Sequence, residues 1–463
     1  MTASKQILSL LAAGLPGLAT LSAQTPKQPV NIIIFLVDDL GWKDLGCYGS
    51  KYFETPAVDQ LAKNGARFTD SYSACTVCSP SRAALMTGKY PARLHITDWI
   101  PGDQRTNTKL KEPEWTMFLS LKEHTLAEVL KENGYHTASI GKWHLGEDSV
   151  YWPENRGFNL NVGGYHKGQP KSYFSPYINP RMTDGPAGEY ITDRLTEESI
   201  GFIRKNKEHP FFLYLSHYAV HSPFQGKKEM IRKYQEKTDP DNPKPNPVYA
   251  AMVESMDQSM GKIMDELARL KLTSKTYVFF LSDNGGLSPR ATTNFPLREG
   301  KGTPYEGGVR TPLIISGPKI PKGSVVHNPA ITMDVFATVL DILNIPKKDR
   351  YLDGVSLLPA IKGKKNLTER ALFWHYPHYH SQGATPYSAI RLNQWKFYYF
   401  YEDGHNELYD LEQYLSETKD LASQLPEKVA ELNVLLKNWL AETNAQLPAT
   451  NTNFDPQKQN RKK

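Results

Sequence analysis

The chain has 463 residues, 39% of them hydrophobic, which suffices for a large core and suggests about two or three domains. Its formal net charge of +6 is modest for this length, and no basic run is interleaved with aromatic residues, so nucleic acid is not an expected partner. Three cysteines are too few for a disulfide framework, although a bridge between Cys47 and Cys75 remains open.

The N-terminal segment has the pattern of a secretory signal peptide, predicted over residues 1–23. Lys5 gives a basic start, residues 7–18 form an apolar stretch, and Ala23 is a small residue suited to cleavage. Glycine and proline interrupt the apolar stretch, which is also too short for a stable membrane anchor. We therefore expect a secreted or periplasmic protein.

Short apolar runs alternate with helical patterns along most of the chain. This order is typical of an α/β protein in which helices flank a large, mostly parallel sheet. The first run is rich in β-branched residues, as expected of a strand buried on both faces. Strands are expected at 31–37, 136–140, 211–215, 276–281 and 312–315. Helices are expected at 58–64, 126–133, 197–206, 249–270 and 333–343.

The pattern changes after a short, basic, turn-prone stretch near residue 365. We place a domain boundary there, so that a main domain spans 24–365 and a smaller C-terminal α+β subdomain spans 366–463. Apolar runs in the second part predict an antiparallel sheet followed by a helix near 429–440. Residues 444–463 are polar and are expected to form a mobile tail.

Oxygen-bearing side chains come just after two of the predicted strands. Asp38 and Asp39 follow the first strand, and Asp283 and Asn284 follow the fourth. Since ligands of open α/β sheets bind at the carboxyl ends of strands, the two pairs can converge. An all-oxygen set selects a hard cation, which makes calcium the expected metal and magnesium the alternative. The other reading is that these residues are turn formers at strand exits.

Cys78 lies at the expected N-terminus of a helix. Ser79 and Pro80 suit a first helical turn, and good helix formers follow them. Such a position favours a bound anion, and Arg82 is one turn further along. A zinc or redox role for the Cys75-x-x-Cys78 pair is the alternative, but a zinc site needs more ligands than the chain offers nearby.

The run from Cys78 to Arg82, with Thr87-Gly88 downstream, resembles the signature of type I sulfatases in the alkaline-phosphatase-like superfamily. In that family a maturation enzyme oxidises the cysteine to formylglycine (3-oxoalanine), whose aldehyde hydrates to a geminal diol. The resemblance implies that a formylglycine-generating enzyme is a partner and that the diol is the nucleophile. It also implies one divalent ion, Ca²⁺ or Mg²⁺, held by residues Asp38, Asp39, Cys78, Asp283 and Asn284.

Three further clusters match this family in the expected order. Lys142 and His144 lie in Gly-Lys-Trp-His-Leu-Gly, His221 precedes Ser-Pro, and Lys301 lies in a glycine-rich loop. Taken singly, each is more typical of a surface cation or a structural histidine. The resemblance extends over about residues 30–315, which makes this part a catalytic domain. It implies a catalytic set of Cys78, Arg82, Lys142, His144, His221 and Lys301.

The resemblance also implies a mechanism. The metal ion and the basic side chains would surround a sulfate ester and stabilise charge in the transition state. One hydroxyl of the diol would attack sulfur while His221 protonates the departing alcohol. His144 would then deprotonate the second hydroxyl, so that the aldehyde re-forms and inorganic sulfate leaves.

Aromatic and polar clusters suggest a carbohydrate substrate. His166 lies in one cluster, and His375 and His378 lie in another; we expect these three histidines to bind substrate. The partner would be a sulfated mono-, oligo- or polysaccharide, with galactose or N-acetylgalactosamine sulfate as the first candidates. A phosphodiesterase or phosphonate hydrolase of the same superfamily is one alternative, and a non-catalytic protein that binds sulfated glycans is another.

Overall fold

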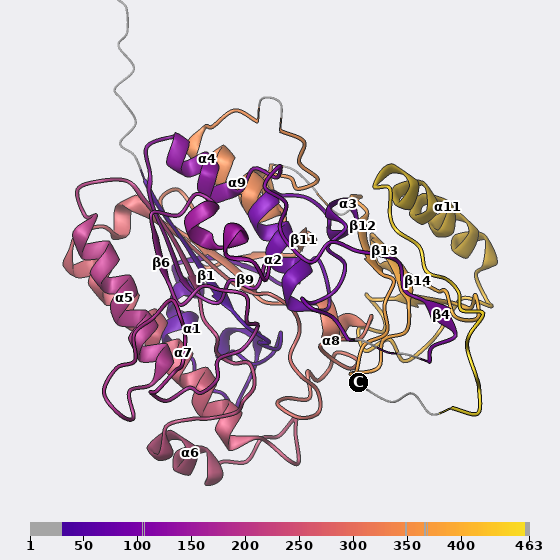
Figure 1. The fold of residues 1–463 in the computed structure, drawn as a ribbon, viewed down its shortest axis with the longest axis horizontal. Coiled ribbons are helices and arrows are strands. Elements are labelled where there is room, and N and C mark those ends of the chain that lie inside the picture. The colour runs from indigo at the N-terminus through magenta and orange to yellow at the C-terminus, as the bar shows by residue number, and fades with distance from the viewer. Residues whose placement is uncertain are drawn as a thin grey trace, which may run out of the picture.

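The computed structural model describes residues 30–458, apart from 104, 106, 348, 349, 365, 366 and 368. The predicted signal peptide and the two residues that flank the predicted domain boundary lie outside the described residues. Figure 1 shows a large body built around one sheet, with a smaller sheet and a single helix beside it.

The main sheet has eight strands, and the strands expected from the sequence form its centre. Its order is β10 (Ser324–Val326), β2 (Gly65–Phe68), β9 (Leu313–Ser316), β8 (Thr276–Ser282), β1 (Asn31–Val37), β7 (Phe211–Ser216), β5 (His136–Gly141) and β6 (Leu160–Val162). Only β9 runs antiparallel to its neighbours within this sheet. The prediction of a large, mostly parallel sheet is therefore confirmed.

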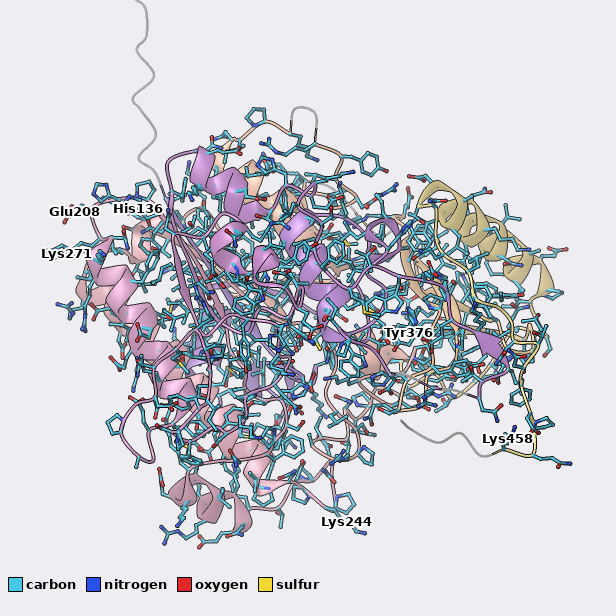
Figure 2. The ribbon with its side chains drawn as sticks, viewed as in Figure 1. His136, Glu208, Lys244, Lys271, Tyr376 and Lys458 are labelled. Carbon is cyan, nitrogen blue, oxygen red and sulfur yellow. The ribbon has the colours of Figure 1, made fainter. Side chains whose placement is uncertain are left out.

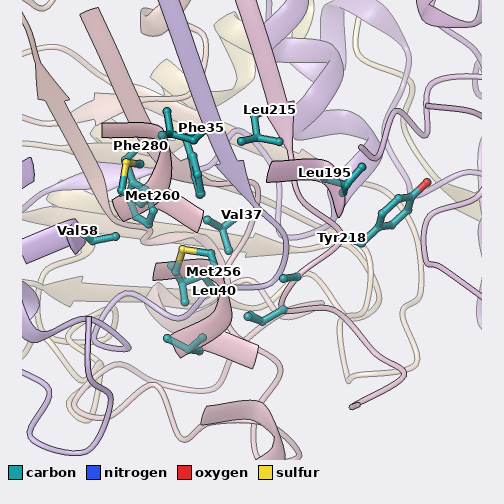
Figure 3. Packing of buried hydrophobic residues seen from close by; sticks show 14 of the residues in the cluster. Phe35, Val37, Leu40, Val58, Leu195, Leu215, Tyr218, Met256, Met260 and Phe280 are labelled. Atoms are coloured by element: carbon teal, nitrogen blue, oxygen red, sulfur yellow. The ribbon is translucent and has the colours of Figure 1, made fainter. Parts of the chain in front are cut away.

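Helices cover both faces of this sheet, because side chains of each strand point alternately to either side. From β1, Phe35 and Val37 pack towards the face covered by α1 (Pro56–Lys63), α5 (Ile191–Lys205) and α7 (Pro247–Arg269), and Figure 3 shows this packing. Ile34 and Leu36 pack on the other face. That face is covered by α2 (Cys78–Thr87), α4 (Leu126–Glu132), α9 (Asp334–Leu343) and α10 (Leu358–Ile361).

The C-terminal part forms the predicted antiparallel sheet with its helix. The strands β12 (Leu372–Tyr376), β13 (Tyr387–Leu392), β14 (Trp395–Phe400) and β15 (Asn406–Asp410) pair in sequence order, and α11 (Pro426–Glu442) packs against them. Figure 2 shows Tyr376 on the side of this sheet that faces the large body. Its hydroxyl donates a hydrogen bond of 2.6 Å to Asp98, so the two parts share buried contacts.

Strand register brings the loops with the predicted site residues to one edge of the main sheet. Val37 at the end of β1 pairs with Ser282 at the end of β8. Gly141 at the end of β5 pairs with Ser216 at the end of β7. The segments that follow these four strands therefore begin side by side. The opposite ends of β5, β7 and β8 are marked in Figure 2 by His136, Glu208 and Lys271.

Residues 444–458 differ from the expectation of a mobile tail, and residues 459–463 of that expected tail lie outside the described residues. Within the described part, β16 (Ala449–Thr450) pairs with β4 (Leu110–Lys111), and the Asn107 side chain donates to the carbonyl of Asp455 at 2.8 Å. The hydrogen-bonding groups of this polar segment are thus paired by a distant part of the chain, which composition alone does not reveal.

Shorter elements complete the structure. The remaining helices are α3 (Pro91–Leu94), α6 (Lys228–Gln235) and α8 (Glu306–Val309). A separate two-stranded sheet pairs β3 (Ser71–Tyr72) with β11 (Ala330–Ile331). Turns of 3-10 helix lie at Gly46–Tyr48, Ser149–Tyr151, Pro153–Asn155 and Thr273–Lys275. Among the described residues, no helix combines the length and apolar character needed to cross a membrane.

Candidate active site

Cys78 is the first residue of α2 and is buried at its N-terminus, as the sequence indicates. The preceding turn is fixed by Ser81, whose hydroxyl accepts from the Cys75 N–H and donates to the Cys75 carbonyl, both at 3.0 Å. Cys75 and Cys47 are both free thiols, so the structure does not contain a bridge between them. Burial raises the pKa of the Cys78 thiol, so the encoded side chain is a weak nucleophile at neutral pH.

Arg82 lies one turn along α2 and is fully buried. Its Nε and Nη2 donate to Asp283 Oδ2 at 2.9 and 2.7 Å, and its Nη1 donates to Ser216 Oγ at 2.6 Å. Burial opposes ionisation of Asp283, but Arg82 and Lys142 outweigh it and lower the pKa of this carboxyl. Arg82 therefore joins the ends of α2, β7 and β8 through charge-assisted hydrogen bonds.

The two aspartates after β1 pair with the two predicted lysines. Lys142 Nζ lies 2.7 Å from Asp38 Oδ2, and Lys301 Nζ lies 2.7 Å from Asp39 Oδ1. Asn284 Nδ2 also donates to Asp39 Oδ1, at 2.8 Å. The structure thus brings together acidic and basic residues that are up to 262 positions apart in the sequence.

The acidic residues suit a hard divalent cation. Donor atoms of Asp38, Cys78 and Asp283 all lie within 4.8 Å of one another. Asp38 Oδ1 and Asn284 Oδ1 are buried and accept no hydrogen bond from any described residue. Burial and the neighbouring Asp283 raise the pKa of Asp38 to about 8, because they make its negative charge unfavourable. A bound cation would stabilise that charge. Free carboxylate and amide oxygens of this kind are typical ligands of Ca²⁺ and Mg²⁺.

Two histidines of the predicted set have defined tautomers, because each bonds to a carbonyl oxygen that can only accept. His144 Nε2 donates to Ile100 O at 2.6 Å, which leaves Nδ1 as a buried acceptor without a partner among the described residues. His221 Nδ1 donates to Ser222 O at 2.8 Å, and its Nε2 lies 3.6 Å from Asp39 Oδ2. Burial, reinforced by the neighbouring lysines, lowers the pKa of both rings.

These residues lie at one side of a cavity of about 390 Å³. Five of them line it: Asp39, Cys78, His144, His221 and Lys301. Arg82, Lys142 and Asp38 lie behind them and are inaccessible to solvent. The remaining lining residues are Trp99, Ile100, Pro101, Glu147, His166, Lys167, Gly168, Gln169, Ser222, Leu287, Arg290, His380, Ser381 and Gln382.

Of the three histidines expected to bind substrate, only His166 lines this cavity. The structure buries both elsewhere, His375 in the C-terminal sheet and His378 against residues of the large body. His375 bonds to Ser388 Oγ at 2.7 Å and to a main-chain carbonyl, and His378 bonds to Thr97 Oγ1 at 2.8 Å and to a carboxylate. Both rings are therefore occupied by structural hydrogen bonds. His380, in the segment after β12, lines the cavity instead.

The loop that carries Lys301 is held by the C-terminal part, a contact that the sequence did not reveal. The Ala384 N–H donates to Gly302 O at 3.1 Å, and the Glu306 N–H donates to Glu417 Oε2 at 2.8 Å. Glu306 and Glu417 are both buried. Neither lies in a pattern that identifies its partner, because the pairing depends on packing between two separate sheets.

The sequence matches two family profiles. The profile of the sulfatase family covers residues 30–345, and a profile for the C-terminal part of N-sulphoglucosamine sulphohydrolase covers residues 300–446. The N-acetylgalactosamine-6-sulfatase of Canis lupus familiaris is 34% identical, in an alignment that covers 86% of this chain and 76% of that sulfatase. A sulfatase of Formosa agariphila is 31% identical, in an alignment that covers 92% of this chain and 91% of that protein.

Solved structures agree with these matches. The crystal structure of Ps i-CgsB superposes with a TM-score of 0.77 at 31% identity, and the match covers 90% of this chain and 94% of that one. A second structure of Ps i-CgsB contains k-i-k-neocarrahexaose and superposes with a TM-score of 0.76. The fold is thus alkaline-phosphatase-like, as expected. With a matching profile over most of its length and a buried cysteine among paired aspartates and basic residues, this chain belongs to the sulfatase family and is a sulfuric ester hydrolase.

Proposed function

We propose that this enzyme removes sulfate from a sulfated carbohydrate, with a formylglycine at position 78 and a divalent cation in its active site. The observation that carries the proposal is the arrangement around Cys78. Lys301 reaches the cavity beside it, and Arg82 and Lys142 lie behind, each bonded to an aspartate of the site. Positive charge buried on one side of a cavity suits an anionic sulfate group.

The cation would be held by Asp38, Asp39, Asp283, Asn284 and an oxygen of residue 78. Calcium is the proposed metal, with magnesium as the alternative. When bound, it would act as a Lewis acid that polarises a sulfate oxygen. The acceptor oxygens of Asp38 and Asn284 that lack partners among the described residues support this assignment. Lys142 and Lys301 would keep the aspartates oriented and limit the negative charge of the site.

The nucleophile would come from Cys78 after oxidation by a formylglycine-generating enzyme. The hydrated aldehyde would supply one hydroxyl for attack on sulfur and a second hydroxyl whose deprotonation would allow sulfate to leave. The N-terminus of α2 favours negative charge at this position. Removing Lys301 should cost about 3 kcal/mol of transition-state stabilisation, by analogy with deleted oxyanion donors.

The two histidines would transfer the protons. His144 lines the cavity, its Nε2 donates to Ile100 O, and its Nδ1 has no partner among the described residues, so His144 suits the role of base. His221 lines the same cavity, and its neutral ring carries its proton on Nδ1, bonded to Ser222 O. To protonate the leaving oxygen, its Nε2, 3.6 Å from Asp39 Oδ2, would first take up a proton, which the bound sulfate anion and Asp39 would favour. The tautomer of each ring is fixed by a main-chain carbonyl, which keeps the reactive nitrogen aimed at the cavity.

The lining supports a sugar as substrate. Trp99, Ile100, Pro101 and Leu287 offer apolar surface, and the basic and amide side chains around them offer hydrogen bonds. The relatives include an N-acetylgalactosamine-6-sulfatase and a protein solved with k-i-k-neocarrahexaose. We therefore propose galactose or N-acetylgalactosamine sulfate, within a mono-, oligo- or polysaccharide, as the first substrates to test. Such substrates agree with a secreted or periplasmic enzyme.

Mass spectrometry of the peptide that contains residue 78, from protein of the native host, tests the nucleophile. Conversion of the thiol to an aldehyde lowers the mass by about 18 Da. Turnover of sulfated galactosides, compared with an aryl sulfate and a phosphate diester, tests the reaction. An unmodified thiol together with binding but no turnover of sulfated sugars would show a glycan-binding protein. Preference for the phosphate diester would show a phosphodiesterase instead.

A further inference from the structure

Two kinds of basic side chain lie in the wall of the cavity or directly behind it. The first kind consists of Arg82, Lys142 and Lys301 beside residue 78, which together with their aspartate partners we call the sulfate site. Each of these three residues lies 2.7 Å from an aspartate oxygen. Lys167 and Arg290 also line the cavity, but they are exposed and form no ion pair or side-chain hydrogen bond with any described residue. Because the reaction at position 78 uses only the buried group, these two cations have no role in the mechanism above.

Lys167 and Arg290 come from two different loops. Lys167 lies in the segment between β6 and α5, and Arg290 lies in the segment between β8 and α8. One acidic side chain outside the sulfate site, Glu147, also lines the cavity, but it is exposed and lies beyond ion-pair distance of both cations. Two cations against one carboxylate leave this part of the lining positive, which attracts an anionic group of the ligand.

We propose that Lys167 and Arg290 form a second anion subsite, which binds a further sulfate or a carboxylate on the same glycan whose sulfate ester is hydrolysed. The inference rests on the proposed function and names a narrower substrate class: glycans that carry at least two anionic groups. Both groups present equivalent oxygen atoms to a guanidinium or an ammonium group, so the chemistry of recognition is shared. The apolar lining, with Trp99 and Leu287, would contact the sugar ring between the two anionic groups.

Three matched oligosaccharides distinguish the sources of the anion. The first carries only the scissile sulfate, the second adds another sulfate, and the third carries a uronic acid carboxylate in its place. We expect kcat/KM to be higher for at least one doubly charged compound than for the first. We call the kcat/KM for a doubly charged compound divided by the kcat/KM for the first compound the preference ratio. Arg290→Gln and Lys167→Gln should each lower this preference ratio about tenfold, as for the loss of one hydrogen bond to a charged group. Added salt should lower it as well.

Two exposed residues outside the cavity provide matched controls. Lys171→Gln and Arg232→Gln remove the same charges but should leave the ratio unchanged, because neither side chain lines the cavity. Arg290→Lys should retain part of the preference, which a purely structural effect of the substitution would not explain. Equal kcat/KM values for all three compounds, or equal loss in the control variants, would overturn the inference.

Binding measurements separate failure of this inference from failure of the proposed function. The Cys78→Ala protein lacks the nucleophile, so titration calorimetry with the same three compounds reports binding alone. Tighter binding of a doubly charged compound, lost in Arg290→Gln, would support the subsite even without turnover of any sulfate ester. Turnover of the singly charged compound without any preference in binding would confirm the reaction and reject the subsite.

Discussion

Gly168 lies directly against the imidazole ring of His144. A Cβ atom at position 168 would lie 2.5 Å from His144 Cε1 and 2.8 Å from its Nδ1. The contact is to the nitrogen that we assign as base, while the opposite nitrogen is bonded to Ile100 O. Position 168 therefore accepts only glycine if His144 is to keep this orientation.

Gly168→Ala should lower kcat/KM for a sugar sulfate roughly a hundredfold, because displacement of a catalytic group by about 1 Å can have that effect. The far-UV circular dichroism spectrum and Tm should change little, since the ring can move into the cavity. Gly201→Ala is the matched control. It lies in α5, and outside the neighbouring backbone of that helix no atom of the described residues would lie within 4 Å of the added methyl group, so activity should be retained. Full activity of the Gly168→Ala protein would contradict the assigned position of His144.

His221→Ala should separate substrates by their leaving groups. A sugar alcohol needs a proton as it departs, so we expect a loss of about a hundredfold or more on a sugar sulfate. A nitrophenyl sulfate has a stable leaving anion and should be hydrolysed nearly as fast as before. His209→Ala, an exposed histidine before β7, is the control. Equal losses on both substrates would reject His221 as the acid.

Removal of divalent metal should lower both activity and stability. After chelation, only the basic residues would balance the negative charge of the three buried aspartates, so Tm should fall. At a cation concentration 100 times its Kd, restored binding should contribute about 2.7 kcal/mol to the free energy of unfolding. Thermal denaturation with EDTA, then with added Ca²⁺ or Mg²⁺, measures this. Unchanged Tm and activity after complete chelation would exclude the metal site.

The buried pair of Glu306 and Glu417 should make stability depend on pH. Burial and the neighbouring Glu306 raise the pKa of Glu417 from 4.5 to about 8. In the folded protein Glu417 therefore keeps a proton that the unfolded chain loses above about pH 4.5. Its contribution to stability is complete below that pH and is lost as pH rises towards 8, by at most about 1.4 kcal/mol per pH unit.

Glu417→Gln should flatten this dependence, because the amide keeps the shape of the protonated carboxyl and does not titrate. Urea denaturation at pH 5 to 8 measures the slope for both proteins. Glu412→Gln, which changes an exposed glutamate, should retain the slope of the parent protein. If the Glu417→Gln protein keeps the parental slope, another group is responsible for it.

The core of the fold and the centre of the site were predictable from sequence because their signals are local. The run after Asn31 is a continuous apolar strand rich in β-branched residues, and Asp38 and Asp39 follow it without a gap. The start of α2 at Cys78 follows from proline and helix-forming residues. In each case the residues that define the element are neighbours in the sequence, so spacing carries the information.

The rest depends on packing between distant segments. His375 and His378 lie in an aromatic and polar cluster of the kind that can bind a sugar, but the ring of His375 is bonded to Ser388 on the neighbouring strand and that of His378 to Thr97, 281 residues away. The pairing of β16 with β4 joins segments more than 330 residues apart. Local composition could not distinguish these buried partners from a binding surface or a mobile tail.

The attachment of the Lys301 loop to the C-terminal part has a consequence for the order of folding. Lys301 is synthesised before Ala384 and Glu417, which hold its loop through Gly302 and Glu306. During synthesis, a chain that ends before residue 384 contains every charged residue of the sulfate site yet lacks these two anchors. The last fifth of the chain thus holds the Lys301 loop in place, and the active site is completed only when the chain is nearly whole.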